Sequence, residues 1–270
     1  GLSAEWYYTT SSDPADRKLS MGGVRPDTGR NVNGLRNAIS LLIETRGVGI
    51  GRLHLARRVH THLTAITSVL GSAAQRSADL VKLRRFVDSE VTAKACQGEA
   101  IVEAEATPSE YRLTMIDPAT GADKRLVVAW DSALALQKLK ARARPCGYWL
   151  AADQVDAVRR LRGLGVVVQR IDQAGALCAE TFRELSRETG VRDDVRGQID
   201  DAGGVLKVKV ETVSALIDVG PGSWYVGLDQ PLANLVIAAL EPDSQSSYVA
   251  HRIIDSVASE ARVMLRPATS

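Results

Sequence analysis

The sequence has few aromatic residues, and this scarcity limits how its core can be built. Phenylalanine occurs only twice, and aromatic residues make up 4% of the 270 residues. Apolar residues still account for 45% and charged residues for 24%, which is ordinary for a soluble globular protein. We therefore expect a core of Leu, Val, Ile and Ala, in a chain long enough for one large or two ordinary domains.

Long apolar runs and a strong excess of one charge are also lacking. No run approaches the roughly 18 apolar residues of a membrane-spanning helix, and the first residues show no basic stretch followed by an apolar one, as a signal peptide would. The formal net charge is +2 and the pI is near 8.5. These features predict a protein that binds neither membranes nor nucleic acid.

Cysteine and histidine are too sparse for the common metal motifs. The three cysteines are widely spaced and form no Cys-x-x-Cys pair: Cys96, Cys146 and Cys178. Either one disulfide with a free thiol or three buried thiols fits this spacing. No histidine has another histidine four residues away, the spacing that zinc sites on helices favour: the four are His54, His60, His62 and His251. We predict no metal site within this chain.

The short apolar run from Ile39 to Ile43 ends at a carboxylate. Glu44 follows the run directly, and Arg46 lies two residues further on. The run is typical of a buried strand. Glu44 can mark the point where that strand leaves the core, or it can serve a ligand site, because open α/β sheets bind ligands outside the carboxyl ends of their strands.

Several arginines lie close to Glu44 in the sequence: Arg25, Arg30, Arg36 and Arg46. A carboxylate among guanidinium groups can be a structural ion pair. It can equally be a general base beside a site that binds a substrate carboxylate. The residue types alone leave both explanations open.

The rest of the sequence alternates between helix and strand patterns. Residues 1–37 are rich in Gly, Pro, Asp and Asn and are predicted to be loop. Helices are expected over about 55–70, 77–95, 153–164 and 229–241, and strands on both sides of a turn at 118–121 and over about 146–151, 166–171, 206–219 and 223–228. This order predicts an α/β protein in which a partial mixed-sheet segment over 1–96 precedes a smaller α+β accessory domain over 97–270.

Four stretches resemble one enzyme family, and one of them, "ARRVHTHLTAITSVL", looks like the helix that closes the family's catalytic domain. "SMGGVRPDTGRNVNGLRNAISLLIETRG" resembles the last part of the catalytic domain in the bacterial branch of the M14 family of zinc carboxypeptidases. "CGYWLAADQVDAVRRLRGLGVVVQRI" and "GSWYVGLDQPLANLVIAALEPDS" are similar to the C-terminal extension of such members. The first match rests on Gly29-Arg30-Asn31, Gly34-Leu35-Arg36-Asn37 and Leu42-Ile43-Glu44-Thr45-Arg46-Gly47.

The resemblance implies a peptide hydrolase that uses zinc and a glutamate at the end of a strand. Glu44 occupies the position of that general base, and Arg30 and Arg46 are candidates to bind the peptide substrate. Tyr7 or Tyr8 could correspond to the family's substrate-contacting tyrosine. The resemblance also suggests a periplasmic or secreted protein.

One departure from the family pattern changes what this chain is expected to do. No histidine precedes Glu44, and no His-x-x-Glu pair occurs anywhere, although the family binds zinc through such a pair and a later histidine. The chain therefore corresponds to the C-terminal part of such an enzyme, with zinc held elsewhere in the full-length protein. We predict that the chain alone neither binds zinc tightly nor hydrolyses peptides.

A rival hypothesis makes the chain a non-catalytic binding or assembly module. Glu44 would then be a structural ion-pair residue at the end of a strand. In either case, a strand from Ile39 to Ile43 without its neighbours would have exposed edges, and exposed edges favour pairing with a second copy. We accordingly predict self-association through that sheet edge, or a rearrangement of residues 1–50.

Overall fold

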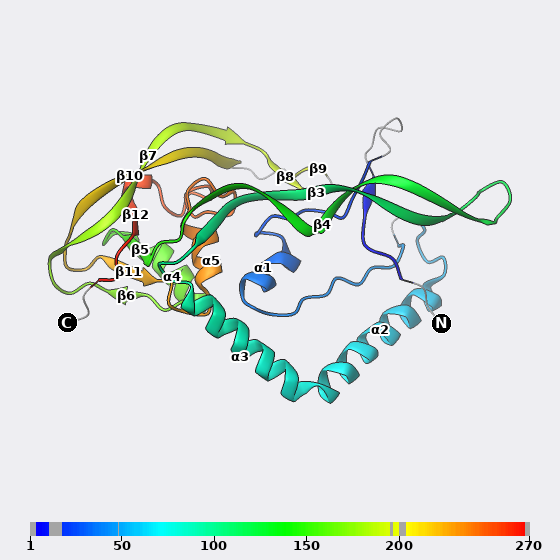
Figure 1. The fold of residues 1–270 in the computed structure, drawn as a ribbon. Coiled ribbons are helices and arrows are strands. Elements are labelled where there is room, and N and C mark those ends of the chain that lie inside the picture. Colours follow the sequence, from blue (N-terminus) through cyan, green and yellow to red (C-terminus); the bar gives the residue numbers. More distant parts are fainter. Residues whose placement is uncertain (1–3, 11–17, 48, 195–196, 200–203, 268–270) are drawn as a thin grey trace. The chain divides into compact units, whose positions relative to one another are not determined.

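The computed structural model describes residues 4–10, 18–47, 49–194, 197–199 and 204–267 (Figure 1). Its helices and sheets make an α/β protein, as the sequence predicts. The chain divides into two compact units, each built from three separate segments. The first unit contains Gly1–Val24, Leu41–Val81 and Ala104–Gln137, and the second contains Arg25–Ser40, Lys82–Glu103 and Lys138–Ser270. Both units draw on residues from either side of position 96, and the boundary between a catalytic and an accessory part stays a prediction.

The first unit combines a long helix with a mixed four-stranded sheet in the order β1-β2-β4-β3. Strand β2 is parallel to β4, with Leu19 opposite Trp130, and β1 is antiparallel to β2. A small core forms where Trp130 meets Leu19, Leu113 and the stacked ring of Tyr111, 4.6 Å away. The elements are β1 (Thr9–Thr10), β2 (Leu19–Ser20), α2 (Leu55–Gln75), β3 (Glu99–Ile116) and β4 (Asp123–Ala143); β3 and β4 extend into the second unit.

The prediction of a strand from Ile39 to Ile43 is wrong. These residues adopt no strand or helix, and Ile39 and Leu41 are 70% and 60% exposed. An apolar, β-branched run becomes a strand only where another strand pairs with its backbone and other side chains cover it. No described strand pairs with this run, so the sheet edge expected there is absent.

Helix α2 forms as the periodicity predicts, but its apolar stripe is not covered. None of its residues is buried within the part of the chain that the structure describes. The exposed apolar side chains are Leu55, Val59, Leu63, Ile66, Val69 and Leu70. The described helices include none that is both long and apolar enough to cross a membrane.

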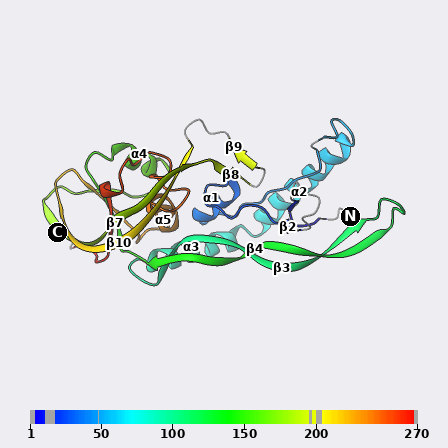
Figure 2. The ribbon, with the colours of Figure 1, turned by 90° about the horizontal axis from the view of Figure 1, so that it is seen from above.

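The second unit is built on a six-stranded antiparallel sheet in the order β10-β7-β12-β5-β11-β6. Strands β7 and β10 lie side by side along their full length (Figure 2). The strands are β5 (Gly147–Leu150), β6 (Gln169–Arg170), β7 (Gly175–Gly190), β10 (Val205–Val219), β11 (Trp224–Gly227) and β12 (Glu260–Val263), with a separate pair, β8 (Arg192–Asp194) and β9 (Gly197–Ile199). The predicted strand over 166–171 shrinks to β6.

Helices pack against this sheet and complete the main core. The helices are α1 (Gly29–Leu35), α3 (Ser77–Ala93, entering this unit at Lys82), α4 (Val155–Gly163), α5 (Ala233–Leu240) and a 3-10 turn, η1 (Val257–Ser259). Helix α4 buries Val158 and Leu161, whereas Val155 is exposed. Helix α5 begins after Leu232, a few residues later than the sequence predicts.

A disulfide joins Cys96, just after α3, to Cys146 at the start of β5. Cys178 is a free thiol at the surface. Of the two alternatives that the cysteine spacing left open, the structure has the single disulfide. The bond closes a segment that contains the whole β3–β4 hairpin.

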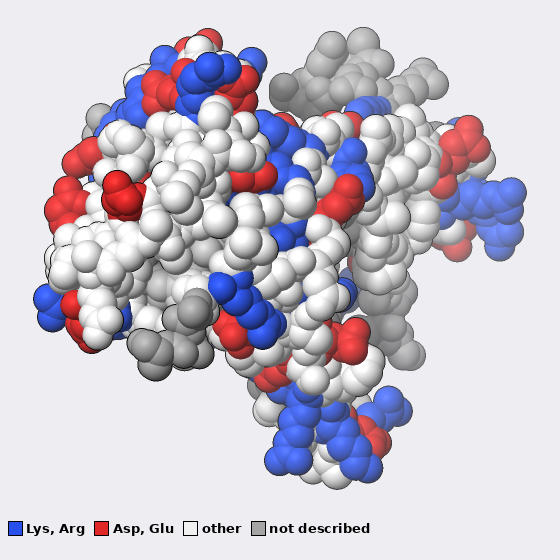
Figure 3. Space-filling view, turned by 60° about the vertical axis from the view of Figure 1, so that its left-hand side comes forward, with Lys and Arg blue, Asp and Glu red and all other residues white. Residues whose placement is uncertain are grey.

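Charged side chains also lie inside the second unit. Glu241, which directly follows α5, is fully buried and accepts three hydrogen bonds. The donors are the Tyr148 hydroxyl at 2.7 Å, Arg262 Nε at 2.9 Å and Arg142 Nη1 at 2.6 Å. Every buried charge needs such partners, because transfer of an ion out of water is costly. On the surface, Figure 3 shows Lys and Arg in small groups, most with Asp or Glu beside them.

Candidate functional site

The predicted site residues fall in different units of the structure. Glu44 and Arg46 are exposed and lie in the irregular segment that precedes α2, in the first unit. Arg30 lies in α1 of the second unit, and its side chain is outside the described part. Glu44 and Arg46 thus share one segment of the first unit, and a role of Arg30 beside them stays a prediction.

The segment around Glu44 is held against the first half of α2. The Thr45 hydroxyl lies 3.1 Å from Nε2 of His62, and Arg58 Nη2 donates a hydrogen bond of 2.6 Å to the Gly51 carbonyl. A Cβ atom at Gly47 would lie 2.8 Å from Arg58 Nη1, the far end of a flexible side chain that can move aside.

A shallow hollow of about 360 Å³ lies beside this segment. Its lining is mostly apolar, with one guanidinium and one imidazole: Thr45, Leu55, Arg58, Val59, His62, Leu63 and Ile66. Glu44 does not line the hollow. The hollow itself is mostly apolar, with the Arg58 guanidinium as its charged group.

The residues present do not fit a zinc ion. The described residues contain no group of three or more His, Cys, Asp or Glu side chains close enough to hold a metal. His60 and His62 lie on α2, and His62 is engaged by Thr45. Tyr8 packs against Trp130, with 5.9 Å between ring centroids, and so serves the small core of the first unit.

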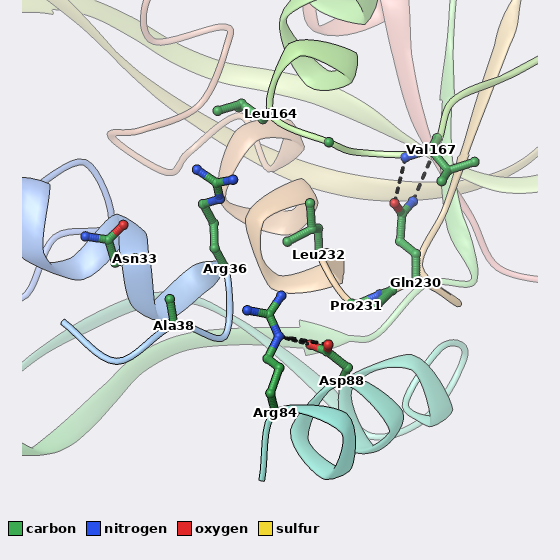
Figure 4. Close-up of a pocket in the computed structure, with 11 residues that line it drawn as sticks. Asn33, Arg36, Ala38, Arg84, Asp88, Leu164, Val167, Gln230, Pro231 and Leu232 are labelled. Carbon is green, nitrogen blue, oxygen red and sulfur yellow. Dashed lines mark hydrogen bonds and ion pairs between the residues drawn. The ribbon is translucent and has the colours of Figure 1, made fainter. Parts of the chain in front are cut away.

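A larger pocket, of about 500 Å³, lies within the second unit (Figure 4). It is formed by the end of α1, one face of α3, the loop after α4 and the loop before α5. Its lining residues are Asn33, Arg36, Ala38, Arg84, Asp88, Leu164, Gly165, Val167, Gln230, Pro231 and Leu232. Arg36 extends toward Leu164, and Arg84 extends from α3 toward the loop of Pro231 and Leu232 (Figure 4).

Asn37 holds the floor of this pocket together. Its backbone has φ of 54°, in the left-handed region that Asn tolerates better than most residues. Its amide nitrogen donates to Asp88 Oδ1 at 2.8 Å and to the Pro231 carbonyl at 2.9 Å. One side chain at the end of α1 thereby links α3 to the loop before α5.

Gln230 fixes the opposite wall. This buried amide accepts a hydrogen bond from the Val167 N–H at 2.8 Å. Its nitrogen donates to the carbonyls of Val167, at 3.1 Å, and Gly227, at 2.6 Å. The loops after α4 and before α5 are thus joined by a side chain that uses both of its N–H donors and its carbonyl oxygen.

Asp88 is the acidic group of the pocket. Burial acts to raise the pKa of its carboxyl, but hydrogen bonds from Asn37 and Arg84 outweigh burial and hold the pKa below its usual value. Arg84 Nε lies 2.9 and 2.8 Å from the two carboxylate oxygens. At neutral pH the pocket therefore contains an ionised Asp88 and two guanidinium groups, of Arg36 and Arg84.

Neither Arg84 nor Asp88 belongs to a motif that the sequence alone relates to function. Their i, i+4 spacing on a helix is a recognisable ion-pair signal, and Arg36 belongs to the motif Gly34-Leu35-Arg36-Asn37. No sequence pattern, however, indicates that these residues meet Gln230 and Val167.

Comparison with known proteins relates the chain to carboxypeptidases. It is 25% identical over 256 residues to carboxypeptidase 2 of Trichophyton rubrum and, equally, to carboxypeptidase 2 of Trichophyton equinum. The match to carboxypeptidase 2 of Trichophyton tonsurans is 24% identical over 256 residues. These matches cover 92% of this chain but 45% of each relative, so the chain spans about half the length of the curated relatives it matches. No family model and no solved structure matches the chain. The similarity supports a carboxypeptidase-like relationship, and the relatives that carry it are fungal.

Proposed function

We propose that this chain is part of a zinc-dependent metallocarboxypeptidase of the M14 type that hydrolyses peptide bonds, with Glu44 as its general base. The observation that carries the proposal is the similarity to fungal carboxypeptidase 2 over 92% of the chain. The resemblance of the segment around Glu44 to the bacterial branch of the M14 family supplies the finer assignment.

In this proposal the Glu44 carboxylate accepts a proton from the attacking water and later delivers it to the leaving amine. The carboxylate gives up the same proton that it accepted, so Glu44 is ionised at the start and at the end of the cycle. Arg46 lies two residues away, and Arg30 is the second candidate to bind the peptide. Guanidinium groups bind a terminal carboxylate through two parallel hydrogen bonds.

Zinc would be held by residues outside the part described here, because no described cluster suits it. The chain alone would then lack the activated water and would be inactive. Mass spectrometry of the native chain after dialysis with zinc tests this directly. We expect far less than about one zinc per chain. One tightly held zinc per chain would contradict the proposal.

The role of Glu44 needs a polypeptide that carries this chain together with the zinc-ligand part. Glu44→Gln keeps the shape of the side chain and removes its basicity. We expect peptide turnover to fall by at least about 100-fold, because general-base catalysis contributes on the order of 10²–10⁴. Glu90→Gln, at an exposed acid on α3, is the matched control and should keep full turnover. Unchanged turnover in Glu44→Gln would remove Glu44 from the mechanism.

A second candidate function is a non-catalytic assembly module that associates with itself or with another chain. The apolar side chains exposed on α2 and at Ile39 and Leu41 favour it, since exposed apolar patches mark interaction surfaces. Sedimentation velocity over a range of concentrations tests it. A monomer at every concentration would count against self-association.

We also propose that the protein works outside the cytoplasm, in the periplasm or the medium. The disulfide between Cys96 and Cys146 supports this location, because disulfides persist in oxidising compartments. Fractionation of producing cells, with an antibody against the chain, tests the location.

A further inference from the structure

We propose that the pocket of the second unit binds a small monocarboxylate with an apolar side chain, the chemistry of the last residue of a peptide. The choice of a peptide as the source of the carboxylate rests on the proposed function. The choice of a carboxylate with an apolar body rests on the pocket alone. Part of its lining comes from residues 164–167 and 230–232, which the family resemblance places outside the catalytic domain.

The charge of the pocket calls for a monoanion. The side chain of Arg36 forms no hydrogen bond or ion pair with the residues that the structure describes, and it is exposed at the pocket. Arg84 contacts Asp88 through Nε, and within the described part of the chain both of its terminal nitrogens remain to donate. Two guanidinium groups and one carboxylate leave a surplus of one positive charge. A carboxylate that accepts paired N–H groups from arginine neutralises that surplus.

The walls call for an apolar body attached to that carboxylate. Ala38, Leu164, Val167, Pro231 and Leu232 form most of the remaining lining. Val167 is 62% exposed, and a ligand would cover it. The volume of about 500 Å³ lies within the range of small-molecule sites. A bare inorganic anion would leave these apolar walls in water.

The pocket is shaped before a ligand arrives. Asn37 and Gln230 each join two segments that form its lining, through hydrogen bonds of 2.6 to 3.1 Å. Asp88 fixes Arg84 through the Nε contacts already described. A site held in this way loses little conformational freedom when it binds, which favours affinity for a small ligand.

The test uses the full 270-residue chain and two probes that differ only in charge. N-acetyl-leucine has a free carboxylate, and N-acetyl-leucinamide replaces it with a neutral amide. We expect N-acetyl-leucine to bind at least about tenfold more tightly, the size of one charge-assisted contact, and to shift the NMR amide signals of Val167 and Leu232. Equal binding of the two probes, or no binding of either, would overturn the proposal.

Arg36→Gln should reduce the affinity for N-acetyl-leucine to that for the amide, while leaving the thermal unfolding midpoint unchanged, since Arg36 is exposed and unpaired. Arg85→Gln, next to Arg84 on α3 but outside the pocket lining, is the matched control and should bind as the natural chain does. A loss of affinity in Arg85→Gln equal to that in Arg36→Gln would indicate general charge attraction and refute the site.

Inorganic phosphate is the third probe in the binding experiment. Binding of phosphate more tightly than N-acetyl-leucine would overturn the assignment to a monocarboxylate with an apolar body. None of these measurements needs turnover. Failure of the carboxypeptidase proposal would therefore leave the pocket result standing, and failure of the pocket would leave Glu44→Gln unaffected.

Discussion

Glu260 is the residue whose environment is least favourable to its charge. Its side chain lies in β12, is 1% exposed, and neither carboxylate oxygen has a hydrogen-bond partner among the described residues. Burial, and then the nearby Glu241 carboxylate, raise the pKa of Glu260 well above its usual value. The folded state therefore holds a proton that the unfolded chain releases at its ordinary pKa.

This raised pKa predicts how stability changes with pH. Above the unfolded pKa of about 4.3, the folded state binds more protons than the unfolded state, so stability falls as pH rises toward the folded pKa. Glu260→Gln removes the ionisation. We expect it to be more stable than the natural chain at pH 8, by on the order of 1–3 kcal/mol, and to differ little at pH 4. Urea unfolding across that pH range measures both.

Glu188→Gln is the control, at an exposed residue of β7, and should follow the natural pH dependence. A Glu260→Gln protein that loses stability at pH 8 would mean that the ionised carboxylate is stabilised by a group that the structure does not show. Such a result would also make Glu260 a candidate ligand-binding acid.

Neither buried glutamate could be predicted from the sequence. Glu241 lies between an apolar helix and Pro242, a position typical of an exposed helix end, yet it accepts three buried hydrogen bonds. Its donors come from residues 142, 148 and 262, and local sequence carries no information on such distant partners. Glu44 shows the reverse: its apolar neighbours indicate burial, but the structure exposes them.

At the scale of elements, the periodicity of apolar residues predicts where helices form, but not whether their apolar faces are buried. Helices α2, α3, α4 and α5 all form near their expected positions. The short helix α1 was missed, because glycine and asparagine make its sequence a poor helix former. The strand expected at Ile39–Ile43 fails because a strand depends on partners that its own sequence does not contain.

The exposed stripe of α2 leads to a prediction that compares two leucines. Leu63 on α2 is 59% exposed, whereas Leu161 on α4 is fully buried. We expect Leu63→Ala to change the free energy of unfolding by less than about 0.5 kcal/mol. Leu161→Ala should cost about 2–5 kcal/mol, since it leaves a cavity in a packed core. Urea unfolding at low protein concentration measures both variants.

A cost for Leu63→Ala as large as that for Leu161→Ala would mean that the stripe is covered in solution. Repeating the measurement at higher protein concentration then shows whether a second copy or another part of the same chain covers the stripe. A cost that grows with concentration indicates a second copy, and a constant cost indicates contacts within one chain.

At the scale of the whole molecule, the carboxypeptidase relationship and the α/β class were predictable, and the division into two interleaved units was not. Motifs are local in sequence, so short stretches carry the relationship. Compact units depend on contacts between distant segments, such as the hydrogen bond that joins Asn37 to Pro231. The pocket depends on the same kind of contact. Arg36 lies in a motif that the sequence reveals, but its position opposite Arg84 depends on contacts between distant segments.

The disulfide is the covalent form of such a distant contact, and its contribution can be measured. Cys96 and Cys146 are separated by 50 residues, and their bond restricts the unfolded chain. The double variant Cys96→Ala, Cys146→Ala should lower the free energy of unfolding by about 2–4 kcal/mol. Cys178→Ala, at the exposed free thiol, is the control and should change it little.

Thiol labelling tests the same pairing without any substitution. Iodoacetamide should label one thiol per native chain, Cys178, and three after unfolding and reduction, because a disulfide sulfur does not alkylate. Three labelled thiols in unfolded but unreduced chain would mean that the disulfide is absent. The double variant should then unfold like the natural chain, and the argument for an oxidising compartment would lose its support. One labelled thiol under those conditions would instead confirm that Cys96, after α3, and Cys146, before β5, are joined by a disulfide.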